Sequence, residues 1–310
     1  MKAELKLAVI ALLFFTLHPW PSVGYAQGEL TPTSAPAPTM KTLAQIEPRI
    51  AVQSLGAAPP YTITQPGSYY LTGNITVGSG NAININVANV SLDLMGFTIE
   101  STNATAGGVA INVGAVSHLR LRNGNIQSGS TYVPGTLTAR GFAYGILGAN
   151  LSDSAICDIL VGGVGVTGIA VGDGDTVERC KVSSSTNGIT HTGSGLTKDC
   201  TALNCANSGI VGDLVEGCTG YGFSTQGISA RRASFCQGSS QTGTGLKATV
   251  CAQNCVGYSG VSTGMDCTGA TASGCYASTI GGSTSLNAKI AIGCVVSGGS
   301  AAIGNRYNMP

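Results

Sequence analysis

Carboxylates and a basic side chain stand close together in the sequence GDGDTVER. Asp173 and Asp175 occupy alternate positions of this stretch, and carboxylate oxygens are ligands that calcium prefers in proteins. Asp199 and Asp213, further along the chain, are candidates to complete such a metal site. Asp-Gly-Asp is also a common turn sequence, and Arg179 at the end of the stretch is expected to pair with Asp199. We favour the turn and keep the calcium site as the alternative.

Eleven cysteines are a second possible source of chemistry. No Cys-x-x-Cys occurs, and the closest cysteine pairs lack a neighbouring histidine, so the spacing does not indicate a metal site. His118 and His191 are isolated from one another and from the cysteines, and both are expected at the surface.

Eight of the cysteines return at intervals of 18 to 23 residues. They are Cys157, Cys180, Cys200, Cys218, Cys236, Cys255, Cys275 and Cys294. An apolar series keeps phase with them, and its members are Ile146, Ile169, Ile189, Ile210, Ile228, Leu246, Met265 and Leu286. Two features that stay in phase through eight units define a repeat.

The composition of the units predicts their geometry. Each unit holds too little apolar material for a core of its own, so the units must stack on one another. Short runs of strand-forming residues between Gly, Ser, Thr and Asn favour strands and tight turns over helices. We therefore predict an all-β protein, a parallel β-helix (solenoid) in which neighbouring coils lie about 4.8 Å apart.

The repeat also predicts what faces inward and outward. Stacked cysteines would have parallel Cβ vectors, which disfavours a disulfide, and buried free cysteine packs well as a small apolar residue. We expect mostly unbridged thiols, with Cys251 and Cys267 as a candidate isolated pair. Outside, opposite charges such as Glu178 and Lys198 are expected to pair between adjacent coils, at about 0.2–1 kcal/mol for each pair.

The rest of the chain divides into four segments. Residues 1–26 resemble a secretory signal, with an early positive charge, a short apolar run and a small-x-small cleavage site. Residues 27–60 are a Pro/Ala/Thr-rich leader or linker, 61–300 are the β-helix with its N-terminal cap, and 301–310 are a C-terminal tail. We expect a secreted, periplasmic or cell-surface protein with no transmembrane segment in the mature chain.

An insertion at residues 128–141 interrupts the repeat. Tyr132, Arg140 and Tyr144 lie in or beside it, and loops on rigid scaffolds often carry function. A tolerated surface insertion is the favoured interpretation, and a substrate-binding loop is the alternative.

Tyr221 and Tyr258 each follow a repeat cysteine by three residues. Two coils separate them, so their rings would be about 10 Å apart. Such rings could stack on sugars, or they could be ordinary surface tyrosines.

The segments VSLDLMGFTI and LRLRNGNI, followed by the Gly-Ile units, resemble the right-handed parallel β-helix (pectin-lyase-like) superfamily, and in particular its exported bacterial repeat proteins of unassigned activity. The resemblance covers about residues 60–300. It implies a single right-handed parallel β-helix of about ten coils with an N-terminal cap.

Enzymes of the superfamily cleave acidic polysaccharides. The resemblance implies that a hydrolase would carry Gly-His-Gly and Arg-x-Lys motifs, which this sequence lacks. A lyase would need a calcium-binding acidic cluster and a catalytic arginine, for which Asp173, Asp175 and Arg179 are the local candidates.

A formal net charge of +1 does not indicate a basic surface of the kind that binds nucleic acid. Three hypotheses remain for an exported β-helix: a non-catalytic structural or glycan-binding protein, a lyase or hydrolase acting on an acidic polysaccharide, or a matrix component. We favour the first, with a polysaccharide or cell-surface glycan as partner and no cofactor; calcium belongs to the second.

Overall fold

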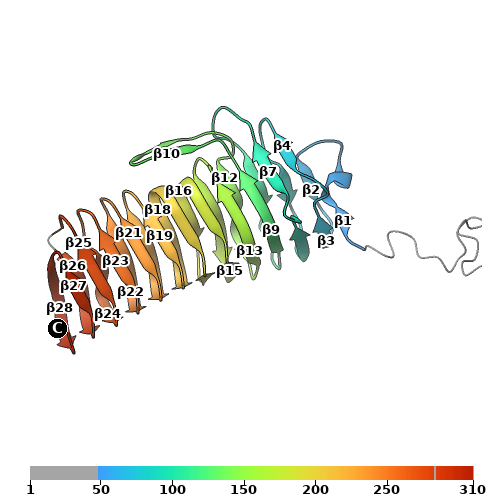
Figure 1. Ribbon diagram of the computed structural model, residues 1–310. Coiled ribbons are helices and arrows are strands. Elements are labelled where there is room, and N and C mark those ends of the chain that lie inside the picture. Colours follow the sequence, from blue (N-terminus) through green and yellow to red (C-terminus); the bar gives the residue numbers. More distant parts are fainter. Residues whose placement is uncertain (1–47, 283, 310) are drawn as a thin grey trace, which may run out of the picture. The chain divides into compact units, whose positions relative to one another are not determined.

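The computed structural model describes residues 48–282 and 284–309. The predicted signal sequence and residues 27–47 of the leader lie outside this range. In the described part, 26 strands form one continuous sheet wound into a parallel β-solenoid, and β10 (Thr131–Val133) and β11 (Thr136–Thr138) form a separate antiparallel hairpin (Figure 1). The predicted fold class is confirmed, with about 12 coils where the sequence suggested about ten.

Each coil contributes to three stacks of strands, which form three sides of the rod. Strands confined to the first stack are β2 (Tyr61–Ile63), β5 (Ile83–Ile85), β8 (Val109–Val113), β12 (Tyr144–Ser152) and β14 (Thr167–Asp173). Strands confined to the second are β1 (Ile50–Ala51), β3 (Gly67–Tyr70), β6 (Val90–Asp93), β15 (Asp175–Glu178) and β17 (Gly195–Lys198). Strands confined to the third are β4 (Ile75–Val77), β7 (Thr98–Ser101), β19 (Thr219–Gly222), β21 (Gln237–Ser240), β23 (Val256–Ser259), β25 (Tyr276–Thr279) and β27 (Val295–Ser297).

The remaining strands are long and pass from one stack to the next. They are β9 (Arg120–Gln127), β13 (Ala155–Gly162), β16 (Lys181–His191), β18 (Thr201–Glu216), β20 (Gln226–Ser234), β22 (Thr244–Gln253), β24 (Met265–Ser273), β26 (Thr284–Ile292) and β28 (Ser300–Tyr307). One such strand serves two or three sides, and single left-handed residues such as Asn123 in β9, Asp158 in β13 and Asn204 in β18 lie at the corners.

One inward column runs through the first stack. Its members pair in parallel register from coil to coil, in the order Tyr61, Ile83, Ile111, Ile146, Ile169, Ile189, Ile210, Ile228, Leu246, Met265, Leu286 and Ala301. All eight residues of the predicted apolar series lie in this column and are fully buried. The predicted phase of the repeat is therefore confirmed.

The cysteine column contains seven of the eight predicted members. Cys180 to Cys294 are buried and stack on one another, and all eleven cysteines, including Cys251 and Cys267, are free thiols. Cys157 was placed wrongly, because Ile159 occupies this column in its coil and Cys157 is partly exposed. Asp158 between them has the left-handed conformation (φ 56°) that Arg179 and Asp199 adopt immediately before their cysteines, and this turn directs the following residue inward.

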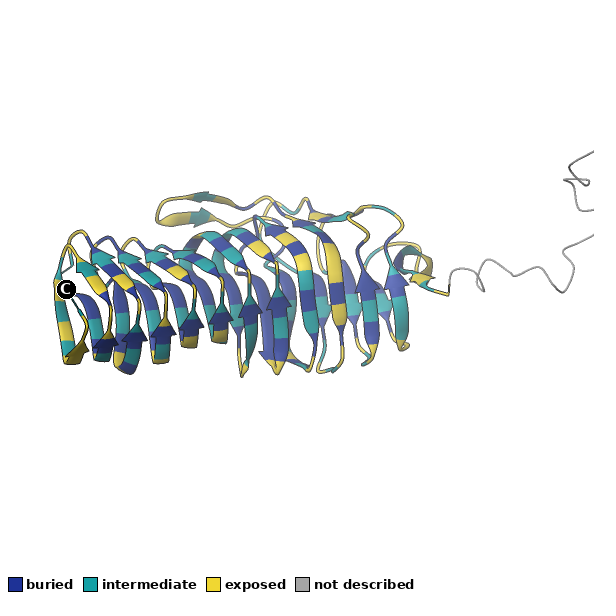
Figure 2. Ribbon diagram, turned by 60° about the horizontal axis from the view of Figure 1, so that its bottom comes forward, coloured by how far each residue is buried: buried dark blue, intermediate teal, exposed yellow. Residues whose placement is uncertain are grey.

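The inward side chains of the third stack are smallest on β19, β21 and β23. Inward positions change from Val161, Val182 and Ala202 to Gly220, Gly238 and Gly257, and then to Ala277 and Val296. A Cβ atom added at Gly220 would lie 2.3 Å from the carbonyl oxygen of Gly227, so only glycine allows this approach of two sides. Figure 2 shows the buried residues recurring along the inside of successive coils.

Outer charges pair between coils, although not as predicted. Arg179 binds Asp158 of the preceding coil (Nε to Oδ1, 2.8 Å) and its own neighbour Glu178 (2.6 Å), whereas Asp199 was the expected partner. Because Cys157 lies outside the cysteine column, Asp158 occupies the corner above Arg179, and this shift explains the error. Arg122 similarly binds Asp93 at 3.1 Å.

The ends of the rod extend beyond the predicted bounds. Residues 48–60 of the leader include β1 and the 3-10 helix η1 (Val52–Leu55), whose Val52 is buried against the first coil. Residues 300–307 form β28, which pairs in parallel with β26, so the stacking continues through most of the predicted tail.

Candidate functional site

The acidic candidates occupy separate environments. Asp175 is 1% exposed, and its two carboxylate oxygens accept hydrogen bonds from the backbone of Ser154 (3.0 Å) and Gly172 (2.8 Å). Burial raises the pKa of Asp175. Asp173 is exposed and accepts from the backbone N–H of Ser194 at 2.8 Å; its bonds to Ser194 lower the pKa of Asp173. The two carboxylates therefore accept hydrogen bonds from different turns of the backbone.

The other two proposed metal ligands, Asp213 and Asp199, lie in different surroundings. Asp213 forms an ion pair with Arg231 (Nη2 to Oδ2, 3.0 Å), and this bond lowers the pKa of Asp213. Asp199 stands at an exposed corner with φ 50°. Within residues 48–282 and 284–309, no three His, Cys, Asp or Glu side chains are grouped to hold a metal ion.

His191 is buried, contrary to the prediction, whereas His118 is exposed as expected. The ring of His191 occupies space that Gly195 leaves open, since a Cβ at Gly195 would lie 2.5 Å from Nδ1. Neither ring nitrogen has a hydrogen-bond partner among the described residues, and the nearby Thr197 hydroxyl also lacks one. Burial lowers the pKa of His191.

The structure brings together three of the five predicted binding residues. Tyr221 and Tyr258 point outward from β19 and β23 of the third stack, with Ser239 of β21 in register between them. Tyr132 reaches the same side from the hairpin, which lies against β16 and β18. Burial raises the pKa of Tyr221, and the proximity of Tyr132 and Tyr258 raises it further.

The tip of the hairpin explains this placement. Pro134 and Gly135 connect its strands, and Gly135 has φ 85°, which favours glycine. A Cβ at Gly135 would lie 3.2 Å from the ring of Phe223, directly after β19. Phe223 was not identified from the sequence. Its position two residues after Tyr221 is the only signal that pointed to it.

Arg140 and Tyr144 do not join the three tyrosines. Arg140 is exposed at the base of the hairpin, where its backbone N–H donates to the Ser130 hydroxyl at 2.8 Å. Tyr144 opens β12 in the first stack, paired with Val109 and Thr167, and belongs to another side of the rod.

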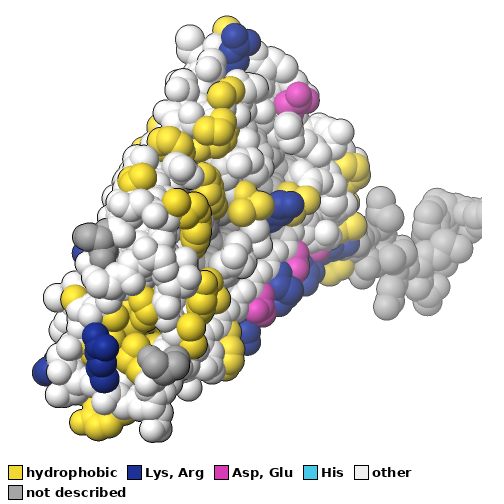
Figure 3. All heavy atoms as spheres, turned by 60° about the vertical axis from the view of Figure 1, so that its left-hand side comes forward, with side chains coloured by type: hydrophobic (Ala, Val, Ile, Leu, Met, Phe, Trp, Pro, Cys, Tyr) yellow, Lys and Arg dark blue, Asp and Glu magenta, His cyan; other side chains and the backbone are white. Residues whose placement is uncertain are grey.

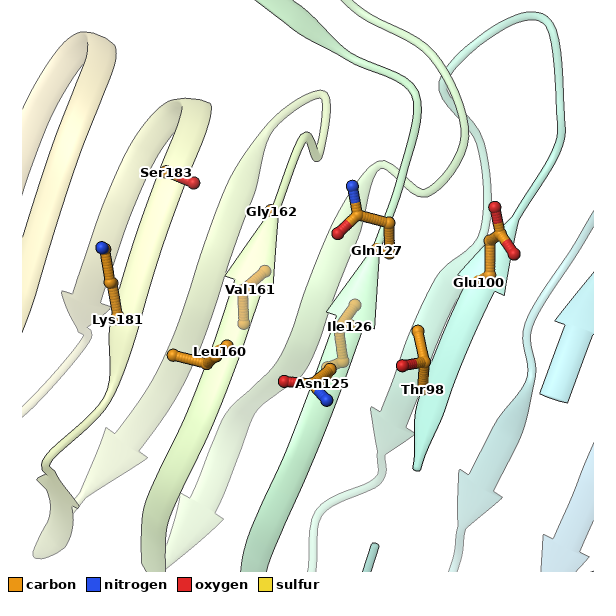
Figure 4. A pocket seen from close by; sticks show the side chains of 10 residues that line it. All are labelled: Thr98, Glu100, Asn125, Ile126, Gln127, Leu160, Val161, Gly162, Lys181 and Ser183. Carbon is orange, nitrogen blue, oxygen red and sulfur yellow. The ribbon is translucent and has the colours of Figure 1, made fainter. Parts of the chain in front are cut away.

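A groove of about 510 Å³ lies on the third stack at the N-terminal side of the tyrosines. Its lining comes from β7, β9, β13 and β16, with Glu100 at one end and Lys181 at the other (Figure 4). The outward column Gln127, Gly162 and Ser183 forms part of the groove and continues in register to Leu203, one coil before Tyr221. The groove and the tyrosines therefore lie on one continuous side, which we call the third face.

The third face loses its charges after Lys181. The third-stack strands β19, β21, β23, β25 and β27 have the sequences TGYG, QGSS, VGYS, YAST and VVS, in which no residue is ionisable apart from the tyrosines. The hairpin strands, TYV and TLT, are likewise without acidic or basic residues. This side offers aromatic rings, hydroxyls and amides.

Comparisons with protein-family models and with curated proteins find no match to this chain. Among the described residues, no helix is long and apolar enough to cross a membrane.

Proposed function

We propose that this protein is an exported, non-catalytic β-helix of the pectin-lyase-like type that binds glycans at the cell surface or outside the cell. The observation that carries the proposal is the cluster of Tyr132, Tyr221 and Tyr258 on the third face. Flat aromatic faces bury the apolar faces of sugar rings, and hydroxyls such as that of Ser239 are matched to sugar hydroxyls.

The arrangement of the carboxylates favours binding over cleavage. A lyase or hydrolase needs its ionisable groups to converge beside one bond. Asp173, Asp175 and Arg179 each have their own structural partners, and Asp175 is buried beneath the surface. A site assembled from them would first have to break these bonds.

Export is proposed from residues 1–26, whose charge and apolar run fit a secretory signal. Mass spectrometry of the protein recovered outside the cytoplasm should find an N-terminus at or near Gln27. Recovery of the full-length chain in the cytoplasm alone would contradict export.

A glycan array probed with the full chain tests the function. We expect retention on a subset of glycans, and a loss of about tenfold or more in affinity when Tyr221 is changed to Ala, since burying a large apolar side chain contributes about 1.5–3 kcal/mol. Tyr307→Ala on β28, exposed on another side, is the matched control and should bind as the parent does.

Two results would count against the proposal. Equal binding by Tyr221→Ala and the parent would remove the tyrosine cluster from the site. Release of unsaturated products from a uronic polymer in the presence of calcium would select a lyase instead.

A further inference from the structure

We infer that the ligand of the third face is a neutral polysaccharide, extended along the axis of the rod, rather than an acidic one. This inference rests on the proposed glycan-binding function and adds the class of glycan. It is carried by the absence of fixed charge around the tyrosines and by the spacing of their rings.

On β19, β21 and β23 of the third stack, the outward side chains are Thr219, Tyr221, Gln237, Ser239, Val256 and Tyr258. None of them carries a charge at neutral pH, and the strands of the overhanging hairpin add none. Lys181 is the nearest basic residue along the same outward column, one coil before Thr201 and two before Thr219.

The lack of charge belongs to this side of the rod and not to the whole molecule. The second stack presents Glu178, Lys198 and Glu216 on successive coils, and Arg122 pairs with Asp93 on the same stack. Figure 3 shows a row of alternating basic and acidic side chains, while most of the visible surface is uncharged.

The energetics of desolvation favour a neutral ligand on such a surface. A uronic polymer would lose hydration around its carboxylates and would find no arginine or lysine on these strands to replace the water, which is unfavourable for a charge. Desolvating sugar hydroxyls costs less free energy, because hydroxyl and amide groups such as those of Thr219, Gln237 and Ser239 can hydrogen-bond with them.

The ring spacing fits an extended chain. Tyr221 and Tyr258 are separated by two strand spacings, about 10 Å, which is comparable to two pyranose units of an extended polymer. A chain parallel to the axis would place alternate sugars on the two tyrosines, and the sugar between them would meet Ser239. The hairpin would cover one edge of that chain, with Tyr132 beside Tyr221.

The test compares binding of the full chain to soluble neutral polymers (β-glucan, xylan and mannan) and to acidic ones (polygalacturonate and alginate) by affinity electrophoresis. We expect retention by at least one neutral polymer, at least tenfold weaker binding to the acidic ones, and little change between about 0.1 M and about 1 M salt. Tyr258→Ala should weaken neutral binding about tenfold, while Tyr307→Ala should not.

The possible failures can be distinguished. Salt-sensitive binding to an acidic polymer that exceeds binding to every neutral one would overturn the inference and leave glycan binding in place. Absence of binding to all five polymers, with the fold confirmed by circular dichroism, would overturn both. If Tyr258→Ala bound the neutral polysaccharides as tightly as the parent, the binding site would not include the rings. That result would also contradict the inference.

Discussion

Cys218 illustrates how the interior of the rod depends on small, uncharged side chains. It is 1% exposed and lies between Cys200 and Cys236 of the same column, where its thiol contacts backbone carbonyls. Burial raises the pKa of the Cys205 thiol, which lies elsewhere in the interior, to about 12, so ionisation is disfavoured at that position.

Cys218→Asp should lower the free energy of unfolding by about 3 kcal/mol or more, because a carboxyl group would enter the core without a partner. Urea denaturation followed by circular dichroism measures the change. Cys218→Ala, which keeps the site small and apolar, is the matched control and should lose less. An aspartate variant as stable as the parent would contradict an inward cysteine column.

His191 predicts a pH dependence of stability. Its pKa lies below the unfolded value of 6.5, so the unfolded chain binds the proton first. The free energy of unfolding should therefore fall as the pH is lowered through about 6.5 and should level off below the folded pKa. Cys200 and Asp213 are the titratable groups near the ring and oppose this shift.

The measurement is urea denaturation at several values between about pH 8 and about pH 5. His191→Leu should remove this part of the slope and should be at least as stable as the parent at the upper end, since no buried ring nitrogen is left unpaired. His118→Gln, at an exposed histidine, should keep the slope. An unchanged slope in His191→Leu would show that other groups cause it.

At this scale, the position of a side chain could be predicted from the sequence where the repeat determines it, and not where the local backbone conformation does. The phase of Ile146 to Leu286 was readable, because the spacing of inward residues is imposed by the coil. Cys157 matched that spacing within a few residues, and only the left-handed turn at Asp158 excludes it from the column. The burial of His191 depends on the absence of a side chain at Gly195, which no spacing rule reveals.

At the scale of elements, the hairpin of β10 and β11 is a part of the described chain that can be altered without altering the coils. Its strands pair only with each other, and its contacts with the rod are made across the third face. The insertion was visible in the sequence. Its direction was not, because a loop of this length can fold toward either end of the rod.

Replacing residues 131–138 by a short Gly-Ser linker should leave the thermal unfolding midpoint nearly unchanged, since none of these residues lies in the solenoid sheet. Glycan binding should weaken because Tyr132 and the cover over Tyr221 are lost. Differential scanning fluorimetry and the binding assay above measure the two effects. A large loss of stability would show instead that the hairpin supports the coils.

Gly135→Val provides a smaller change at the same element. The left-handed backbone and the nearby Phe223 ring both oppose a side chain there. Thr138→Val, in the hairpin but away from its tip, is the matched control. Binding should fall for the first and not for the second.

At the scale of the whole molecule, each coil is held by its neighbours. The middle coils, such as those of β16 and β18, pair on both sides, whereas the described pairing of β28 is with β26. Stability in such stacks is approximately a sum of local and nearest-neighbour contributions, so the ends should open more readily than the centre.

Native-state hydrogen exchange followed by mass spectrometry tests this gradient. Peptides from β14 to β22 should exchange more slowly than the peptide that contains β28. Equal protection along the rod would indicate a single cooperative unit. Slower exchange in β28 than in β16 would indicate that something covers the terminal strand.

The distance between Tyr221 and Tyr258 depends on the single coil between them, which carries Ser239. Deleting that coil would bring the rings to about 4.8 Å, and duplicating it would set them at about 14 Å. The spacing of outward side chains along the rod is therefore set by the backbone hydrogen bonds between strands and not by the side chains. A gain or loss of coils would change the distance between the two rings only in multiples of one strand spacing. The chemistry of each ring's contact would stay the same.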